Sequence, residues 1–340
     1  MSAAALVLPR RRQSRPLLAL VLLMLLLAGA SVIHLGLGAR WIAPQTILQA
    51  LTHYDPRNFD HRIIVDLRLV RLLAALLTGA VLGVAGLLLQ TVIRNPLGEP
   101  HILGLNAGAS LAVVGTSALG LGGLAWERPL IAACGGALLF GGVMLLATSG
   151  RGGATPLRIT LCGVALSAFA SAVTAAILIL DEQTLLAMRT WLAGDLAGLN
   201  GAILRSAAVP ALAGALLALF IAPRLNILAL GDNVALGLGV KIAQTRLLGL
   251  AAIALLCGSA VAVAGPIGFV GLVVPHIVRR LISEDLRLAL PLAAPVGALV
   301  LVVADIAART LVAPQELATG AMTALVGAPV FIFIAARFFK

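Results

Sequence analysis

Charged residues are scarce in this chain. Only 11% of its 340 residues are Asp, Glu, Lys or Arg, against roughly 25% in an ordinary soluble domain. Between Arg246 and Arg279 none of these residues occurs. A soluble domain has no use for repeated stretches of this kind, whereas about 20 consecutive apolar residues cross a bilayer as a helix. We therefore predict an all-α polytopic membrane protein.

The sequence also lacks the motifs of the common catalytic and metal sites. Its three cysteines, Cys134, Cys162 and Cys257, lie in apolar stretches without C-x-x-C spacing, which argues against a disulfide framework or a zinc site. The five histidines are scattered. No G-x-x-x-x-G-K-[ST], H-E-x-x-H or G-x-S-x-G motif is present. We predict no catalytic residue, no metal site and no cofactor in this chain.

Apolar segments fill most of the chain. We expect about ten membrane spans, with a basic cytoplasmic amino terminus at 1–16 and a single transmembrane domain at 17–340. Both termini are then cytoplasmic, and most of the 24 Lys and Arg lie on the cytoplasmic side. The net charge of +11 therefore reflects membrane insertion and does not indicate nucleic-acid binding. The predicted spans are 17–36, 70–90, 102–121, 129–148, 159–180, 203–222, 246–265, 267–282, 289–308 and 319–336.

Two features bear on this topology. Gly265-Pro266 favours a break inside the long uncharged stretch, although composition alone also allows one long span and nine in total. Trp41, Trp126 and Trp191 fall at the outer ends of the predicted spans, where an indole suits the membrane interface.

Ionisable residues deep in the predicted spans are few. Asp305 is the best candidate, but Arg309 follows it by one helical turn, so we expect an i,i+4 ion pair and not a proton relay. With no phosphate loop and no clear ion-coupling group, the chain fits a permease that another subunit drives.

Four groups of segments carry a resemblance. They are Arg68-Leu-Val-Arg71 with 90–100 and 102–109, then 228–240, then 264–279, and finally 304–309 with 316–320 and 327–331. Together they resemble the FecCD/BtuC type of permease, a subunit of ATP-driven importers for iron chelates, haem and cobalamin. The resemblance implies a type II ABC importer permease fold with ten spans. It also implies a second permease subunit, identical or paralogous, two ATPases that bind ATP and magnesium, and a periplasmic binding protein.

The resemblance places an ATPase-coupling segment in the cytoplasmic loop at about 224–245. We expect Asp232 to cap a short helix there and four apolar residues to face a groove in the ATPase. The alternative is a surface helix without a partner. The residues assigned to coupling are Gly231, Asp232, Ala235, Leu236, Leu238, Gly239 and Val240.

The resemblance also implies two further roles. Arg68, Arg71 and Arg309 at outer helix ends would meet acidic residues of the binding protein, although interfacial anchoring is an alternative. A translocation pathway would be lined by small or hydroxylic residues of the fifth span, for which helix packing is the alternative; these are Ala165, Ser167, Ser171 and Thr174.

Within this family the sequences of 191–196 and 228–232 most resemble the ferric citrate and siderophore branch. Haem and cobalamin are alternative cargoes. Val70 and Ala318 stand where the family usually has proline, so local geometry there is expected to differ. An ion-coupled carrier and a non-transporting scaffold remain the alternatives from other classes. The expected location is a bacterial inner membrane.

Overall fold

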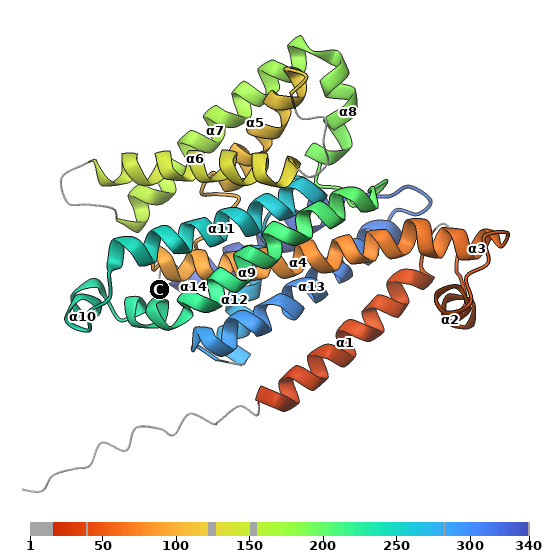
Figure 1. The fold of residues 1–340 in the computed structure, drawn as a ribbon, viewed down its shortest axis with the longest axis horizontal. Coiled ribbons are helices and arrows are strands. Elements are labelled where there is room, and N and C mark those ends of the chain that lie inside the picture. Colours follow the sequence, from red (N-terminus) through yellow and green to blue (C-terminus); the bar gives the residue numbers. More distant parts are fainter. Residues whose placement is uncertain (1–15, 39, 122–126, 150–154, 282, 339–340) are drawn as a thin grey trace, which may run out of the picture.

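The computed structural model describes residues 16–38, 40–121, 127–149, 155–281 and 283–338 as helices joined by turns (Figure 1). No strand occurs in these ranges. A π-helical segment, Ile63–Arg68, joins α3 to α4, so that a continuous helix runs over Phe59–Val92. The α-helices are α1 Pro16–Gly36, α2 Pro44–Thr52, α3 Phe59–Arg62, α4 Leu69–Val92, α5 Leu105–Ala118, α6 Arg128–Thr148, α7 Pro156–Leu180, α8 Glu182–Leu192, α9 Gly201–Ala229, α10 Asp232–Gly237, α11 Ile242–Ala264, α12 Val270–Leu281, α13 Leu286–Thr310 and α14 Thr319–Phe338.

Every predicted span contains a helix. Among the described residues, seven helices are long and apolar enough to cross a membrane. The helices in the remaining three predicted spans are shorter: α5 has 14 residues, α12 has 12, and the apolar part of α14 covers Thr319–Phe333. Helices α5 and α12 are therefore too short to cross a membrane by themselves, whereas α14 has 20 residues in all.

Helix α4 lies at the centre of the bundle and packs against α11, α12 and α13 (Figure 1). Glycine permits the closest approaches. A Cβ atom on Gly79 would lie 2.4 Å from the Gly297 carbonyl oxygen, and one on Gly86 would lie 2.0 Å from that of Gly271. Any larger residue at these positions would force the helices apart, so glycine is what lets α4 approach its neighbours closely.

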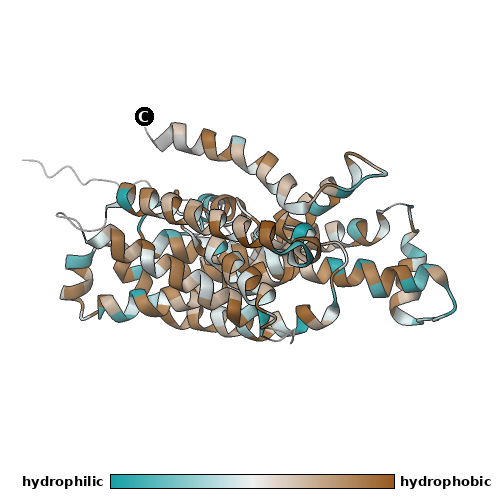
Figure 2. Cartoon of the chain, turned by 90° about the horizontal axis from the view of Figure 1, so that it is seen from above, coloured by the Kyte–Doolittle hydropathy of each residue, from teal (hydrophilic) through white to brown (hydrophobic). Residues whose placement is uncertain are grey.

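The long helices lie roughly side by side, and α5 to α8 form a separate group along one flank of α11 (Figure 1). Hydrophobic residues predominate along their length, and hydrophilic residues gather at the ends and loops (Figure 2). We call these ends the α2 end and the α10 end. Helix α14 diverges from the other helices towards the carboxyl terminus (Figure 2).

The uncharged stretch is broken, as Gly265-Pro266 predicted. Helix α11 ends at Ala264 and α12 begins at Val270. Gly265 has φ +71°, and a Cβ atom there would lie 1.8 Å from the Trp191 carbonyl oxygen, so glycine is required on both counts.

The prediction for Trp191 as an interface residue is wrong. Its indole is buried, donates a hydrogen bond to the Val261 carbonyl at 2.9 Å and stacks under the Arg128 guanidinium. Trp41 is exposed as predicted, and Trp126 lies outside the described residues.

Candidate functional site

A buried ionic cluster ties four helices together at the α2 end. The Asp305 carboxylate, on α13, accepts hydrogen bonds from Arg71 Nε and Nη2 on α4, both at 2.9 Å. His34 Nε2 on α1 lies 2.8 Å away, and Thr319 Oγ1 at the start of α14 donates at 2.6 Å. Asp305 is fully buried, so this set of partners compensates for the cost of its burial. The predicted pair with Arg309 is wrong, because Arg71 supplies the cation.

Arg68 and Arg309 instead cap the carboxyl-terminal end of α1. The last carbonyl groups of a helix have no partner inside that helix, and cationic donors suit them. Both side chains are more than nine-tenths buried by this contact. Arg68 Nη1 donates to the carbonyls of Leu35 (2.6 Å) and Gly36 (2.8 Å), and Arg309 donates to those of His34 (3.2 Å) and Leu37.

The three predicted docking arginines therefore lie together, and they line one cavity of about 660 Å³ at the α2 end. Glu316, in the turn before α14, also lines it. Its carboxylate lies 2.6 Å from Arg71 Nη1 and 3.9 Å from Arg309 Nε. Arg40, a fourth arginine on the cavity wall, pairs with Asp60. The wall carries more cationic than anionic groups, so it is suited to a carboxylate from outside.

At the α10 end, the prediction that Asp232 caps a helix is wrong. Gly231 is the residue at the N-cap, and no side chain caps α10. The Asp232 carboxylate turns away and accepts two hydrogen bonds from Arg246 Nη2, both at 3.0 Å. Arg94 Nη2 lies 3.3 Å from the same carboxylate.

The predicted apolar face of the coupling segment is half correct. Leu236 and Leu238 are exposed, but Ala235 and Val240 are buried against the bundle. Two residues not assigned from the sequence, Leu230 and Val234, are exposed beside them. The register of so short a helix cannot be predicted from periodicity, because α10 has only six residues. Gly239 follows α10 at φ +77°.

The four predicted pathway residues, all on α7, do not share one face. Ala165 and Ser171 are exposed, and Ser167 is half-buried. Thr174 is buried, and its hydroxyl donates to the Ala170 carbonyl at 2.8 Å. Thr174 is therefore covered within this chain, and the pathway role of the four residues stays a prediction.

Sequence reasoning missed a second interior carboxylate. Glu99, in the turn between α4 and α5, is almost completely buried. It accepts hydrogen bonds from the backbone N–H groups of Ile102 (3.1 Å) and Phe269 (3.2 Å), and so joins this turn to the break between α11 and α12. Burial raises the pKa of Glu99.

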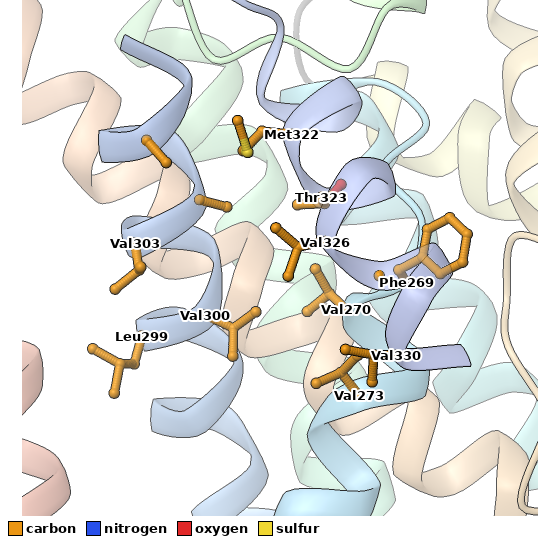
Figure 3. Close-up of a pocket in the computed structure, with 13 residues that line it drawn as sticks. Phe269, Val270, Val273, Leu299, Val300, Val303, Met322, Thr323, Val326 and Val330 are labelled. Carbon is orange, nitrogen blue, oxygen red and sulfur yellow. The ribbon is translucent and has the colours of Figure 1, made fainter. Parts of the chain in front are cut away.

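A cavity of about 330 Å³ lies between α12, α13 and α14 (Figure 3). Its walls are aliphatic and aromatic, for example Phe269, Val300 and Val326. The single hydroxyl, that of Thr323, is satisfied by the Gly320 carbonyl at 2.9 Å. A wall of this kind offers no ligand to a metal or a charged molecule.

Long apolar helices, with most charged groups at the two ends, define a multi-pass helical membrane protein. The model of the FecCD transport family matches residues 22–337, and the chain belongs to this family. It is 40% identical to the ferric enterobactin transport system permease protein FepD of Escherichia coli (strain K12), covering 93% of this chain and 94% of that protein. It is 39% identical to the Fe(3+)-citrate import system permease protein YfmD of Bacillus subtilis (strain 168), covering 96% and 97%.

A solved structure described as an inward-facing conformation of a metal-chelate type ABC transporter has the same fold. The TM-score is 0.75 at 31% identity, and the likeness covers 94% of this chain and 98% of that one.

Proposed function

We propose that this chain is the membrane permease of a binding-protein-dependent ABC importer for a ferric siderophore or ferric citrate. The observation that carries the proposal is the family match over nearly the whole chain, with relatives named for ferric enterobactin and ferric citrate. The fold, shared with a metal-chelate type ABC transporter, supports it. The permease performs no covalent chemistry. Partner ATPases bind ATP and magnesium, and cargo crosses by alternating access.

The ATPase contact is proposed at the α10 end. Leu230, Val234, Leu236 and Leu238 expose four large apolar side chains around one short helix. An apolar patch beside charged groups is typical of a protein interface. This coupling face replaces the set predicted from sequence, since Ala235 and Val240 support the helix from beneath.

The binding-protein contact is proposed at the cavity of the α2 end. The four arginines of its wall outnumber the single carboxylate of Glu316, and this excess of positive charge would attract acidic side chains of the partner, steer docking and fix its orientation. Arg71 itself already pairs with Asp305 and Glu316. Arg68 and Arg309 contribute mainly by holding the end of α1 in place, because their donors are already engaged by its carbonyl groups.

The pathway is proposed along the exposed face of α7, which includes Ala165 and Ser171. The small side chains among its exposed residues would offer a bulky chelate few strong contacts, although large apolar residues such as Leu161 and Phe169 are exposed on α7 as well. A second permease subunit, identical or paralogous, would supply the opposite wall. The assembly lies in a bacterial inner membrane, with the α10 end and both termini cytoplasmic, and the α2 end periplasmic.

The test is uptake of labelled ferric citrate, ferric hydroxamate, haem and cobalamin in cells with and without this chain. Loss of one ferric chelate alone supports the proposal, and loss of haem or cobalamin uptake alone contradicts the cargo. If a proton uncoupler abolishes uptake at constant cellular ATP, the chain is an ion-coupled carrier.

The coupling face is tested in the same cells. Leu236→Asp with Leu238→Asp places two charges where the ATPase would pack, and we expect uptake to fall by roughly tenfold or more, equivalent to about 1.4 kcal/mol. The control is Leu48→Asp on α2, because Leu48 is 63% exposed, like Leu236 at 62%, but lies at the opposite end. Equal losses in the two variants would contradict the assigned coupling face.

A further inference from the structure

One carboxylate joins three separate elements at the α10 end. Asp232 begins α10, Arg246 lies in the second turn of α11, and Arg94 lies in the turn that follows α4. Arg246 Nη2 is 3.0 Å from both carboxylate oxygens, and Arg94 Nη2 is 3.3 Å from Oδ1. We call these three residues the Asp232 clasp.

Unusual backbone conformations occur next to Asp232 and at Arg94 in the clasp. Gly231 has φ +118°, a conformation that side chains oppose, and this turn directs the Asp232 carboxylate back towards the bundle. Arg94 has φ +51°, an uncommon value for a residue other than glycine. The chain around it is held by hydrogen bonds from Arg94 N to Thr91 O (3.3 Å) and from Asn95 N to Gln90 O (3.0 Å).

Arg94 connects the clasp to the most deeply packed helix. The helix that ends just before it runs without interruption from Phe59 to Val92 and carries Arg68 and Arg71 near its other end. Arg246 belongs to α11, which packs against α4 along the bundle. The chain itself connects α10 to α9 and α11. The clasp adds a side-chain connection to the turn after α4 and a second connection to α11.

The clasp contributes little to folding stability. The three side chains are 35% to 41% exposed, and ion pairs at such positions are worth roughly 0–1 kcal/mol. An ion pair of this kind can still fix the position of a short helix that has only a few packed side chains. Its loss should release α10 without unfolding the bundle.

We propose that Arg94 and Arg246 are positioning residues, which hold α10 through Asp232 so that its displacement moves α4 and α11. This inference rests on the proposed function, in which the ATPase pushes on the coupling face. Without the clasp, α10 would move independently of the bundle and ATP hydrolysis would be poorly converted into transport.

The experiment compares Asp232→Asn, which is nearly isosteric, with a reversed clasp that combines Asp232→Arg, Arg94→Asp and Arg246→Asp. Aspartate tolerates positive φ better than most residues, so position 94 accepts it. Arg287→Ala is the control, since Arg287 is an exposed arginine at the same end but outside the clasp. Immunoblots of membranes confirm equal amounts of each variant.

The first readout is hydrogen exchange in the full-length permease in lipid nanodiscs. The amides of Ala235, Leu238 and Val240 are hydrogen-bonded within the coupling segment. We expect Asp232→Asn to speed their exchange about tenfold, because local opening becomes easier, and the reversed clasp to restore it. Unchanged exchange in Asp232→Asn, or no restoration in the reversed clasp, overturns the proposal.

The second readout is uptake of the labelled chelate in cells. We expect Asp232→Asn to lower uptake about fivefold or more, which corresponds to a coupling energy of about 1 kcal/mol or more. Uptake should recover in the reversed clasp. Faster exchange with unchanged uptake overturns the positioning role. If the unaltered chain supports no uptake, the proposed function fails, and hydrogen exchange alone then decides whether the clasp holds α10.

Discussion

Asp305 and Glu99 are both buried carboxylates, but their partners differ. Asp305 has an arginine, a histidine and a hydroxyl around it, whereas Glu99 accepts hydrogen bonds from backbone N–H groups and, among the residues that the structure describes, forms no ion pair with an arginine or lysine. Without an arginine or lysine beside it, a buried carboxylate keeps more of the cost of desolvation when ionised than one that is paired. The two residues should therefore respond differently to pH.

We predict that stability depends on pH through Glu99. Its raised pKa means that the folded protein binds this proton more tightly than the unfolded chain, whose pKa is near the ordinary value of 4.5. The stabilisation is thus complete below that value and is lost as pH rises through the folded-state pKa. The Tm of the detergent-solubilised protein should therefore fall as pH rises above about 4.5, relative to that of Glu99→Gln, whose amide resembles the protonated acid.

Glu182→Gln, at the exposed start of α8, serves as the control. A constant Tm difference between wild type and Glu99→Gln over this pH range would contradict the prediction.

The sequence alone did not reveal the partners of Asp305 and Arg309. Arg71 lies far from Asp305 in sequence, so local spacing favoured Arg309, which is one helical turn away. The α1 carbonyl groups that Arg309 caps also come from a distant segment. Partners of this kind depend on how helices pack, and one sequence does not specify that packing.

Helix contact in this bundle depends on where glycine lies. A Cβ atom on Gly297 would lie 2.1 Å from the Gly79 carbonyl oxygen, so α13 and α4 touch through their backbones. A Cβ atom on Gly141, in α6, would meet nothing within 4 Å. Two glycines inside helices thus have opposite tolerance for substitution.

We predict that Gly297→Val destabilises the protein by about 3 kcal/mol or more, because the central helices must separate. Gly141→Val is the matched control and should behave like wild type. The measurement is the amount of folded protein recovered from membranes and its Tm in detergent. Similar losses in both variants would show that the α4–α13 crossing is not tightly constrained.

At the scale of helices, each span predicted from the sequence contains a helix in the structure. The break at Gly265-Pro266 also lies where the sequence predicted it. Apolar length and glycine-proline pairs act locally, so they can be recognised without the fold. It did not predict that the turn containing Glu99 is buried, because a polar residue between two apolar segments normally indicates solvent. The face of α10 was equally undetermined, since a helix of six residues has no usable periodicity.

The whole molecule carries its charges differently at its two ends. At the α2 end, Arg71 pairs with Asp305 and Glu316, and Arg40 pairs with Asp60. At the α10 end, basic residues outnumber acidic ones; they include Arg94, Arg224, Lys241, Arg246, Arg279, Arg280 and Arg287. An excess of basic residues resists transfer across the membrane during insertion, so the α10 end should be cytoplasmic.

This orientation predicts the labelling of single cysteines. In a variant without Cys134, Cys162 and Cys257, Leu48→Cys on α2 should react with a membrane-impermeant maleimide added to intact spheroplasts, because the α2 end faces outward. Asn233→Cys on α10, also exposed, should react only after the membrane is permeabilised. The reverse pattern would place the coupling face outside, where no ATPase could reach it, and would contradict both the orientation and the proposed direction of transport.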